Sequence, residues 1–156
     1  MQEATTSTWL AKLACRELIE QSVRHVDDGD AEAFSRLFTD DAVLVRPSGA
    51  ALHGREAIRR SYAARPADRI TRHLVTNVVV AVDEHGRARA RSSVLLWSGT
   101  TDAPATAFGR PADARQLVGE FDDQLQRMPD GAWRLHRREA RFVLHTPDDA
   151  GARAGA

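Results

Sequence analysis

Beyond Pro66 the sequence changes from a helical to a strand-like periodicity, and this change constrains the fold more than any other feature. Apolar and polar residues alternate over four long segments, as is typical of β-strands: 71–82, 87–98, 115–127 and 132–144. Turn-forming residues at 83–86 and 129–131 join these segments in pairs, so the sequence predicts two hairpins. A segment with two prolines and a glycine, 103–111, is expected to be a loop.

Three helices are predicted in the first half of the chain. Residues 8–27 carry apolar side chains at three- and four-residue spacing, Gly29 ends that helix, and Asp30 can cap a short second helix. A strand is expected at 42–45 and a third helix over 54–64. Because helices come first and antiparallel strands second, the predicted fold class is α+β, with the helices on one face of a single curved sheet.

The length and composition bound the organisation of the chain. Its 156 residues suffice for one core, so we expect a single domain over 1–146 and a disordered tail over 147–156. Basic and acidic residues balance at 22 each, and the arginine-rich strings alternate with apolar residues as strand faces do, so nucleic-acid binding is not expected. No window approaches the roughly 20 apolar residues that cross a bilayer, and no basic leader opens the sequence. We therefore expect a cytoplasmic protein without membrane contact.

The motifs of common cofactor and metal sites are missing from the sequence. None of the six histidines belongs to an HExxH motif, a paired Cys/His set or a facial triad, so no metal is expected. No phosphate-binding glycine loop, dinucleotide fingerprint or GxSxG motif occurs, so no cofactor is expected either. The single cysteine, Cys15, lies on the apolar face of the first predicted helix and is interpreted as a buried small side chain.

Four strings occur in an order that resembles the nuclear transport factor two-like superfamily, and within it the SnoaL-like and scytalone dehydratase-like branch: DDGDAEAFSRLFTDDAVL, LHGREAI, TRHLVTN and DGAWRL. The resemblance covers most of residues 9–145. It implies a cone-shaped barrel, in which a strongly curved, mostly antiparallel sheet packs against three N-terminal helices around a central pocket. Because this superfamily holds enzymes, ligand binders and assembly subunits, the function depends on the residues of the pocket.

His73 is the strongest catalytic candidate. In the expected strand it shares one face with Val75, Asn77 and Val79, a face that is otherwise nearly apolar. In scytalone dehydratase-like and hexachlorocyclohexane dehydrochlorinase-like proteins, an aspartate at the place of Asp27 pairs with a histidine at the place of His73. A buried carboxylate that accepts one ring N–H fixes the tautomer and leaves the other nitrogen as a base. The alternatives are a hydrogen-bonded core histidine and a capping or solvated aspartate.

Five further residues are candidates for substrate binding. Arg46 offers a guanidinium for a carboxylate, an enolate or a departing anion, although a surface position is the alternative. Glu120 and Asp122 share a strand face, but the sequence leaves open which face points inward. Asn77 can orient a polar group or satisfy a backbone amide, and Trp97 can line the pocket or belong to a core or interface.

The sequence also departs from two relatives of the branch. Scytalone dehydratase-like enzymes carry tyrosines where this chain has Val26 and Arg46, which places their phenol-polarised carbonyl chemistry in doubt. By the same alignment the base of ketosteroid isomerase falls at Arg46 and its tyrosine at Ser22, so that mechanism is excluded.

The sequence predicts a cofactor-independent lyase or isomerase that uses the dyad as a general base, with dehydratase-like elimination on a small hydrophobic cyclic substrate. Polyketide cyclase-like or epoxide hydrolase-like chemistry is the nearest enzymatic variant. The competing interpretation is a non-catalytic small-ligand-binding or assembly subunit, similar to the small subunits of ring-hydroxylating dioxygenases. The resemblance further implies a homodimer or higher homo-oligomer formed through the convex sheet face.

Overall fold

The computed structural model describes residues 2–147, so the predicted tail lies outside the described residues except for position 147. It contains helices α1 (Gln2–Asp27), α2 (Ala31–Arg36) and α3 (Arg55–Ala63). The strands are β1 (Phe38–Val45), β2 (Ala51–His53), β3 (Arg69–Val82), β4 (Arg87–Thr100), β5 (Leu117–Arg127) and β6 (Trp133–His145). The predicted α+β class and the order of the elements are confirmed.

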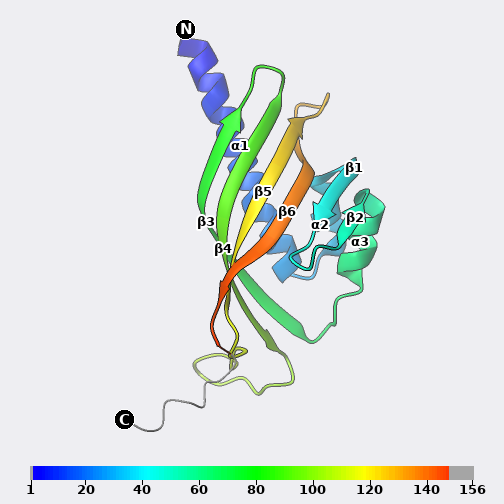
Figure 1. The fold of residues 1–156 in the computed structure, drawn as a ribbon, viewed down its shortest axis with the longest axis vertical. Coiled ribbons are helices and arrows are strands. Elements are labelled where there is room, and N and C mark those ends of the chain that lie inside the picture. Colours follow the sequence, from blue (N-terminus) through cyan, green and yellow to red (C-terminus); the bar gives the residue numbers. More distant parts are fainter. Residues whose placement is uncertain (1, 148–156) are drawn as a thin grey trace.

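All six strands belong to one strongly curved sheet with the order β2-β1-β6-β5-β4-β3 (Figure 1). Its pairs are antiparallel except for β1 and β6, which run parallel. The sheet is mixed and does not close on itself, because β2 and β3 remain edge strands. The predicted cone is therefore open and is not a closed barrel.

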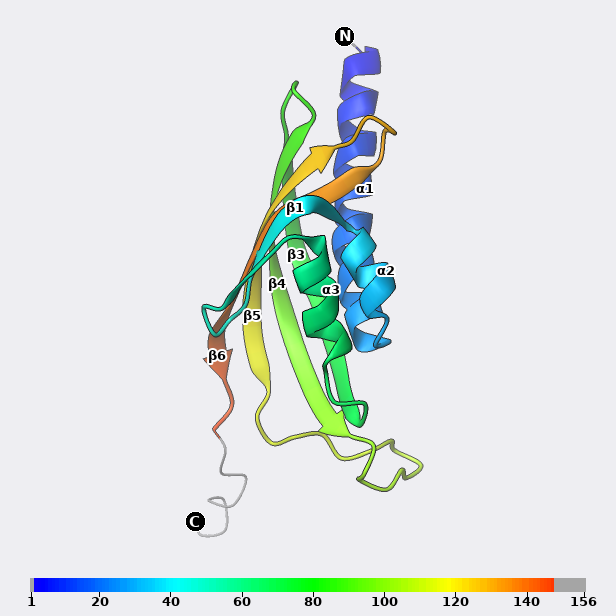
Figure 2. The same ribbon diagram turned by 90° about the vertical axis from the view of Figure 1, so that its right-hand side faces the viewer.

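The three helices lie on one side of the sheet (Figure 2). The buried stripe of α1 consists of Cys15, Leu18, Ile19, Ser22 and Val23, spaced so that one helix face packs on the strands. Opposite this stripe, small and branched side chains of the strands complete the core: Val78, Val80, Ala88, Ala90, Leu125 and Leu135. The helix layer thus covers the concave face and leaves the other face exposed.

Three elements differ from the prediction in the first half of the chain. Helix α1 begins at Gln2, six residues earlier than expected. Strand β1 begins four residues earlier than expected, at Phe38, because Phe38 and Thr39 are buried although the exposed pair Asp40 and Asp41 interrupts the apolar run. The short strand β2 was not predicted, since its three residues are largely exposed; it pairs with β1, and Leu52 packs against the core.

A β-bulge at Asn77 changes which side chains of β3 point inward. Asn77 has a φ of 52°, and the register with β4 shifts between Thr76 and Val79. Beyond the bulge Val78 is buried, whereas Val79 is 70% exposed. The prediction that Val79 and Asn77 share the face of His73 is therefore wrong, because one inserted residue reverses the alternation of a strand.

Candidate active site

Asp27 and His73 meet where the end of α1 packs against edge strand β3. The Nδ1 atom of His73 lies 2.6 Å from Oδ1 of Asp27, and the backbone N–H of His73 donates to Oδ2 at 2.8 Å. Both side chains are largely buried, with 8% of Asp27 and 15% of His73 exposed. The same carboxylate is thus held by the ring and by the backbone of one residue, which fixes the ring orientation.

Two neighbouring residues hold this carboxylate in place. Thr71, two residues before His73 on the same strand face, donates its hydroxyl to Oδ1 of Asp27 at 2.9 Å. Arg65 then donates to Oγ1 of Thr71 at 3.2 Å and to the carbonyl of Val26 at 3.0 Å. This series of hydrogen bonds, from Arg65 through Thr71 to Asp27, connects the end of α1 to the start of β3.

The hydrogen bonds to Asp27 determine which atom carries the shared proton. Burial alone would raise the pKa of Asp27, but the hydrogen bonds and charge of His73 and the bond from Thr71 outweigh it, so this pKa lies below its usual range. The ionised carboxylate only accepts hydrogen bonds, so Nδ1 of His73 carries the proton. Nε2 of His73 makes no hydrogen bond to the described residues and is left as the basic nitrogen.

His73 lines a cavity of about 320 Å³ between the helices and the concave face of the sheet. Its walls are mostly apolar side chains from all three helices and five strands, among them Val23, Phe34, Leu44, Val94 and Phe121. Asp27 is not a lining residue and lies behind His73. Ligand pockets of a few hundred cubic ångströms accept small organic molecules, so the dyad adjoins a ligand-sized space.

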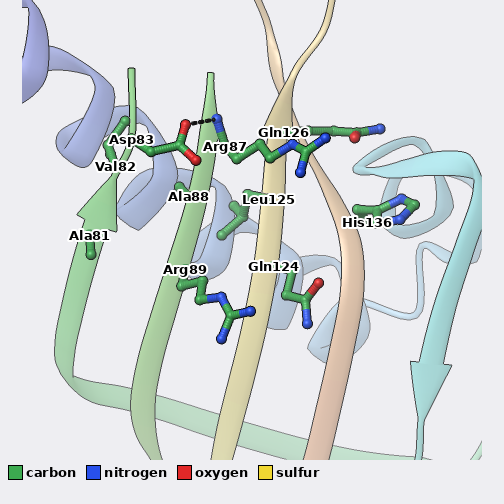
Figure 3. Close-up of a pocket in the computed structure, with 10 residues that line it drawn as sticks. All are labelled: Ala81, Val82, Asp83, Arg87, Ala88, Arg89, Gln124, Leu125, Gln126 and His136. Atoms are coloured by element: carbon green, nitrogen blue, oxygen red, sulfur yellow. Dashed lines mark hydrogen bonds between the residues drawn. The ribbon is translucent and has the colours of Figure 1, made fainter. Parts of the chain in front are cut away.

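Two other hollows help to define this site. One lies between α1 and β3 and also reaches Asp27 and His73. The other, about 520 Å³, lies around the β3–β4 turn, where Asp83 accepts a hydrogen bond from the backbone N–H of Arg87 (Figure 3). Its histidine, His136, contacts Asp41 at 3.5 Å, but 39% of the His136 side chain and 77% of the Asp41 side chain are exposed. That pair is solvated and lacks the shielding of the dyad.

Among the predicted substrate-binding residues, Arg46 lines the cavity and donates a hydrogen bond to Ser61. The other four are not brought to the cavity wall. Asn77 is exposed at the bulge, and Glu120 and Asp122 pair with Arg141 and Arg91 on the opposite side of β5 from Phe121.

Trp97 alternates with Leu95 on the outer sheet face, where Leu74 pairs with Leu95, and all three remain exposed. A row of exposed apolar side chains on this face fits the predicted homodimer. Dimerisation stays a prediction, which sedimentation velocity can test.

Three polar residues at the cavity were not predicted from the sequence as site residues: Arg65, described above, Arg138 and Tyr62. Arg138 forms a buried ion pair with Asp123, its cross-strand partner, through bonds of 2.7 and 2.8 Å, and donates to Ser22 at 2.8 Å. Tyr62 of α3 packs on Phe34 and also lines the cavity. Asp123 alternates with Phe121 and Leu125 in the sequence, and this pattern could have indicated a buried carboxylate that needs a cationic partner.

The described residues contain no group of three or more His, Cys, Asp or Glu side chains that could hold a metal. None of the described helices is long and apolar enough to span a bilayer. Cys15 is completely buried, and burial raises the pKa of its thiol to about 12, so it is an unreactive packing residue.

The chain belongs to the SnoaL-like domain family, which matches residues 7–139. No curated protein matches it. A protein of unknown function from Mycobacterium tuberculosis has a similar structure, with 27% identity over 86% of this chain and 77% of that one and a TM-score of 0.70. A nuclear transport factor two-like protein with a cystatin-like fold from Novosphingobium aromaticivorans shows 25% identity over 97% and 90% of the two chains, with a TM-score of 0.70.

A third similar structure is also from Novosphingobium aromaticivorans and is provisionally named a scytalone dehydratase. It shares 24% identity over 90% of each chain, with a TM-score of 0.75, and at this identity it supports the fold alone. The family resemblance that the sequence predicted is confirmed.

Proposed function

We propose that this protein is a cofactor-independent lyase or isomerase in which His73, held by Asp27, is the general base. The observation that carries the proposal is the 2.6 Å contact between His73 Nδ1 and Asp27 Oδ1 beside a mostly apolar cavity. A core histidine without a chemical role needs no adjoining space of ligand size. Dehydratase-like elimination on a small cyclic substrate is the specific reaction we propose.

In that reaction Nε2 of His73 removes a proton from a carbon next to a carbonyl or an aromatic ring. The electron pair of the broken C–H bond forms the new double bond, and the leaving hydroxyl departs with its own bonding pair. The imidazolium returns its proton to the leaving group, so the products are an alkene and water, with no oxidant or cofactor. Asp27 favours the imidazolium through its charge, and such a base contributes about 100- to 10,000-fold in rate.

The proposal is tested by turnover of a panel of hydroxylated and halogenated cyclic compounds that carry an acidic C–H bond. The variants are His73→Gln, Asp27→Asn and the double variant, and His136→Gln is the matched control, because His136 contacts an aspartate outside the cavity. We expect His73→Gln to lose about 100- to 10,000-fold in kcat/KM. The double variant should be no slower than His73→Gln, because residues that act as a unit are not additive.

Three outcomes would contradict the proposal. Unchanged turnover in both single variants would show that the dyad is structural. An equal loss in His136→Gln would show that the effect is not specific to the cavity. A parent protein that turns over no compound of the panel would favour the non-catalytic ligand-binding alternative.

A further inference from the structure

The wall of the cavity carries an excess of positive charge. Five arginines line it, and no aspartate or glutamate is among its lining residues: Arg46, Arg65, Arg69, Arg138 and Arg141. A guanidinium group does not lose its proton in a protein, so each of these charges persists at every working pH. Partly buried charges require partners, and the partners of these five differ.

Three of the arginines have carboxylate partners of their own. Arg138 is paired with Asp123 through two hydrogen bonds. Arg141 is paired with Glu120, and Arg69 lies 3.5 Å from Asp113. Their charges are therefore already compensated within the protein.

Arg46 and Arg65 have no such partner among the described residues. Arg46 donates to the hydroxyl of Ser61, and Arg65 donates to the Val26 carbonyl and the Thr71 hydroxyl. All of these acceptors are neutral. Both arginines are half-buried, so the protein leaves two cavity charges to be met by water or by a ligand.

Among the described residues, the carboxylate linked to Arg65 is that of Asp27, and the link runs through the hydroxyl of Thr71. Asp27 already accepts three hydrogen bonds, from Thr71 and from the backbone and ring of His73. Asp27 is not a lining residue of the cavity and makes no direct contact with Arg65.

Tyr62 supplies a neutral donor in the same wall. Its ring packs on Phe34 with centroids 4.3 Å apart, and the guanidinium carbon of Arg46 lies 5.4 Å from its centroid. The Tyr62 hydroxyl makes no hydrogen bond to the described residues and is not among their fully enclosed unpaired atoms, so part of its surface is accessible. Tyr62 lines both this cavity and a neighbouring hollow beside the α1–α2 turn.

The Tyr62 hydroxyl also keeps its proton. Burial raises the pKa of Tyr62, and the nearby guanidinium charges, including those of Arg46 and Arg65, oppose the rise without cancelling it. At neutral pH the hydroxyl is therefore protonated and can donate a hydrogen bond.

We propose that Arg46, Arg65 and the Tyr62 hydroxyl form an anion-binding site in the cavity, which takes the ionised carboxylate of a small cyclic ligand. The two guanidinium groups and the phenol supply charged and neutral donors for the two carboxylate oxygens. The apolar walls, including Leu44 and Val94, take the ring of the ligand. In identifying this ligand as the substrate the inference rests on the proposed function, but the anion site itself does not.

The anion site is tested by binding, without turnover, in calorimetric titrations of the His73→Gln protein. The probes are benzoate and 2-naphthoate, each compared with its neutral amide of the same shape. We expect each carboxylate to bind about 10- to 100-fold more tightly than its amide, because hydrogen bonds between charged groups contribute about 1.5–3 kcal/mol. Arg46→Gln and Tyr62→Phe should each reduce this preference by about tenfold or more.

The matched control is Arg59→Gln, because Arg59 lies on the same helix as Tyr62 but is bonded to Glu56 outside the cavity. It should keep the full preference for the carboxylate. Thermal melting shows that each variant is folded before titration. Equal affinity for acid and amide, no binding of either carboxylate by the folded protein, or a preference unchanged in both Arg46→Gln and Tyr62→Phe would overturn the anion site.

The binding result is independent of the catalytic result. If the protein binds carboxylate and amide equally but its turnover still falls in His73→Gln, the anion site alone is rejected. A carboxylate preference without any turnover in the parent would reject the proposed catalysis and retain the anion site.

Discussion

In the part of the chain that the structure describes, two largely buried carboxylates pair with cationic or basic side chains, and the two pairs are built differently. Asp123 meets Arg138 with 1% and 4% of the side chains exposed, and every oxygen of the carboxylate is used by the same guanidinium. The side chains of Asp27 and His73 are somewhat more exposed, and Nε2 of His73 makes no hydrogen bond to the described residues.

This difference matches the two roles that we propose, a structural one for Asp123–Arg138 and a reactive one for Asp27–His73. Arginine stays charged at all accessible pH values, and the Asp123–Arg138 pair connects β5, β6 and, through Ser22, α1. Histidine can gain and lose a proton near neutral pH, and its free nitrogen belongs to a residue that lines the cavity. Burial is common to both pairs, so the proposed role of His73 rests on its free ring nitrogen beside the cavity.

The largest effect on stability is expected from breaking the structural pair. Asp123→Asn should lower the free energy of unfolding by about 3–5 kcal/mol, because it leaves the Arg138 charge buried without compensation. Urea unfolding followed by circular dichroism measures this loss. The matched control is Asp122→Asn, whose partner Arg91 is 78% exposed, and it should cost at most about 1 kcal/mol. An equal loss of unfolding free energy in Asp123→Asn and Asp122→Asn would show that the buried ion pair contributes no more than the exposed one.

A smaller and pH-dependent effect is expected from Asp27→Asn. At pH 7 the substitution should cost about 1–3 kcal/mol, because hydrogen bonds to a charged acceptor are lost. The fold lowers the pKa of Asp27, so its contribution is present above the unfolded value of about 3.9 and is lost as the pH falls through the lower folded value. The stability gap between parent and Asp27→Asn should therefore narrow below about pH 4.

Urea unfolding at a series of pH values from 7 to 2.5 measures this narrowing, with Asp122→Asn as the reference variant. A gap that stays constant or widens as the pH falls would show that Asp27 is not stabilised in its charged form.

The fold was predictable because its signals are local and repeated. Four period-two segments, each bounded by turn residues, place β3 to β6 within a few residues of their observed limits. The pairing of Asp27 with His73 was reached through a family resemblance, since two residues 46 positions apart provide no local signal. The structure brings the two side chains together, but their chemical role remains a proposal.

The cavity wall was harder to predict, because it depends on which strand face points toward the helices. One residue with positive φ, Asn77, reverses the alternation in β3, and the pattern of the side chains alone does not reveal such a bulge. In β5 the sequence separates Glu120 and Asp122 from Phe121 and Leu125. Only the structure shows that the second set is inward, because Leu125 belongs to the core and Phe121 lines the cavity. Asp123 shares the inward face with Phe121 and Leu125, and this position allows its ion pair with Arg138.

The central claim is that Asp27 fixes the His73 ring with the proton on Nδ1 and leaves Nε2 as the base, and nitrogen NMR tests it without a substrate. Long-range proton–nitrogen correlation spectra of the labelled protein distinguish the two tautomers of each histidine. For neutral His73 the account predicts a protonated Nδ1 and an unprotonated Nε2, with this preference lost in Asp27→Asn and kept in His136→Gln. A neutral His73 protonated on Nε2 in the parent would contradict the account.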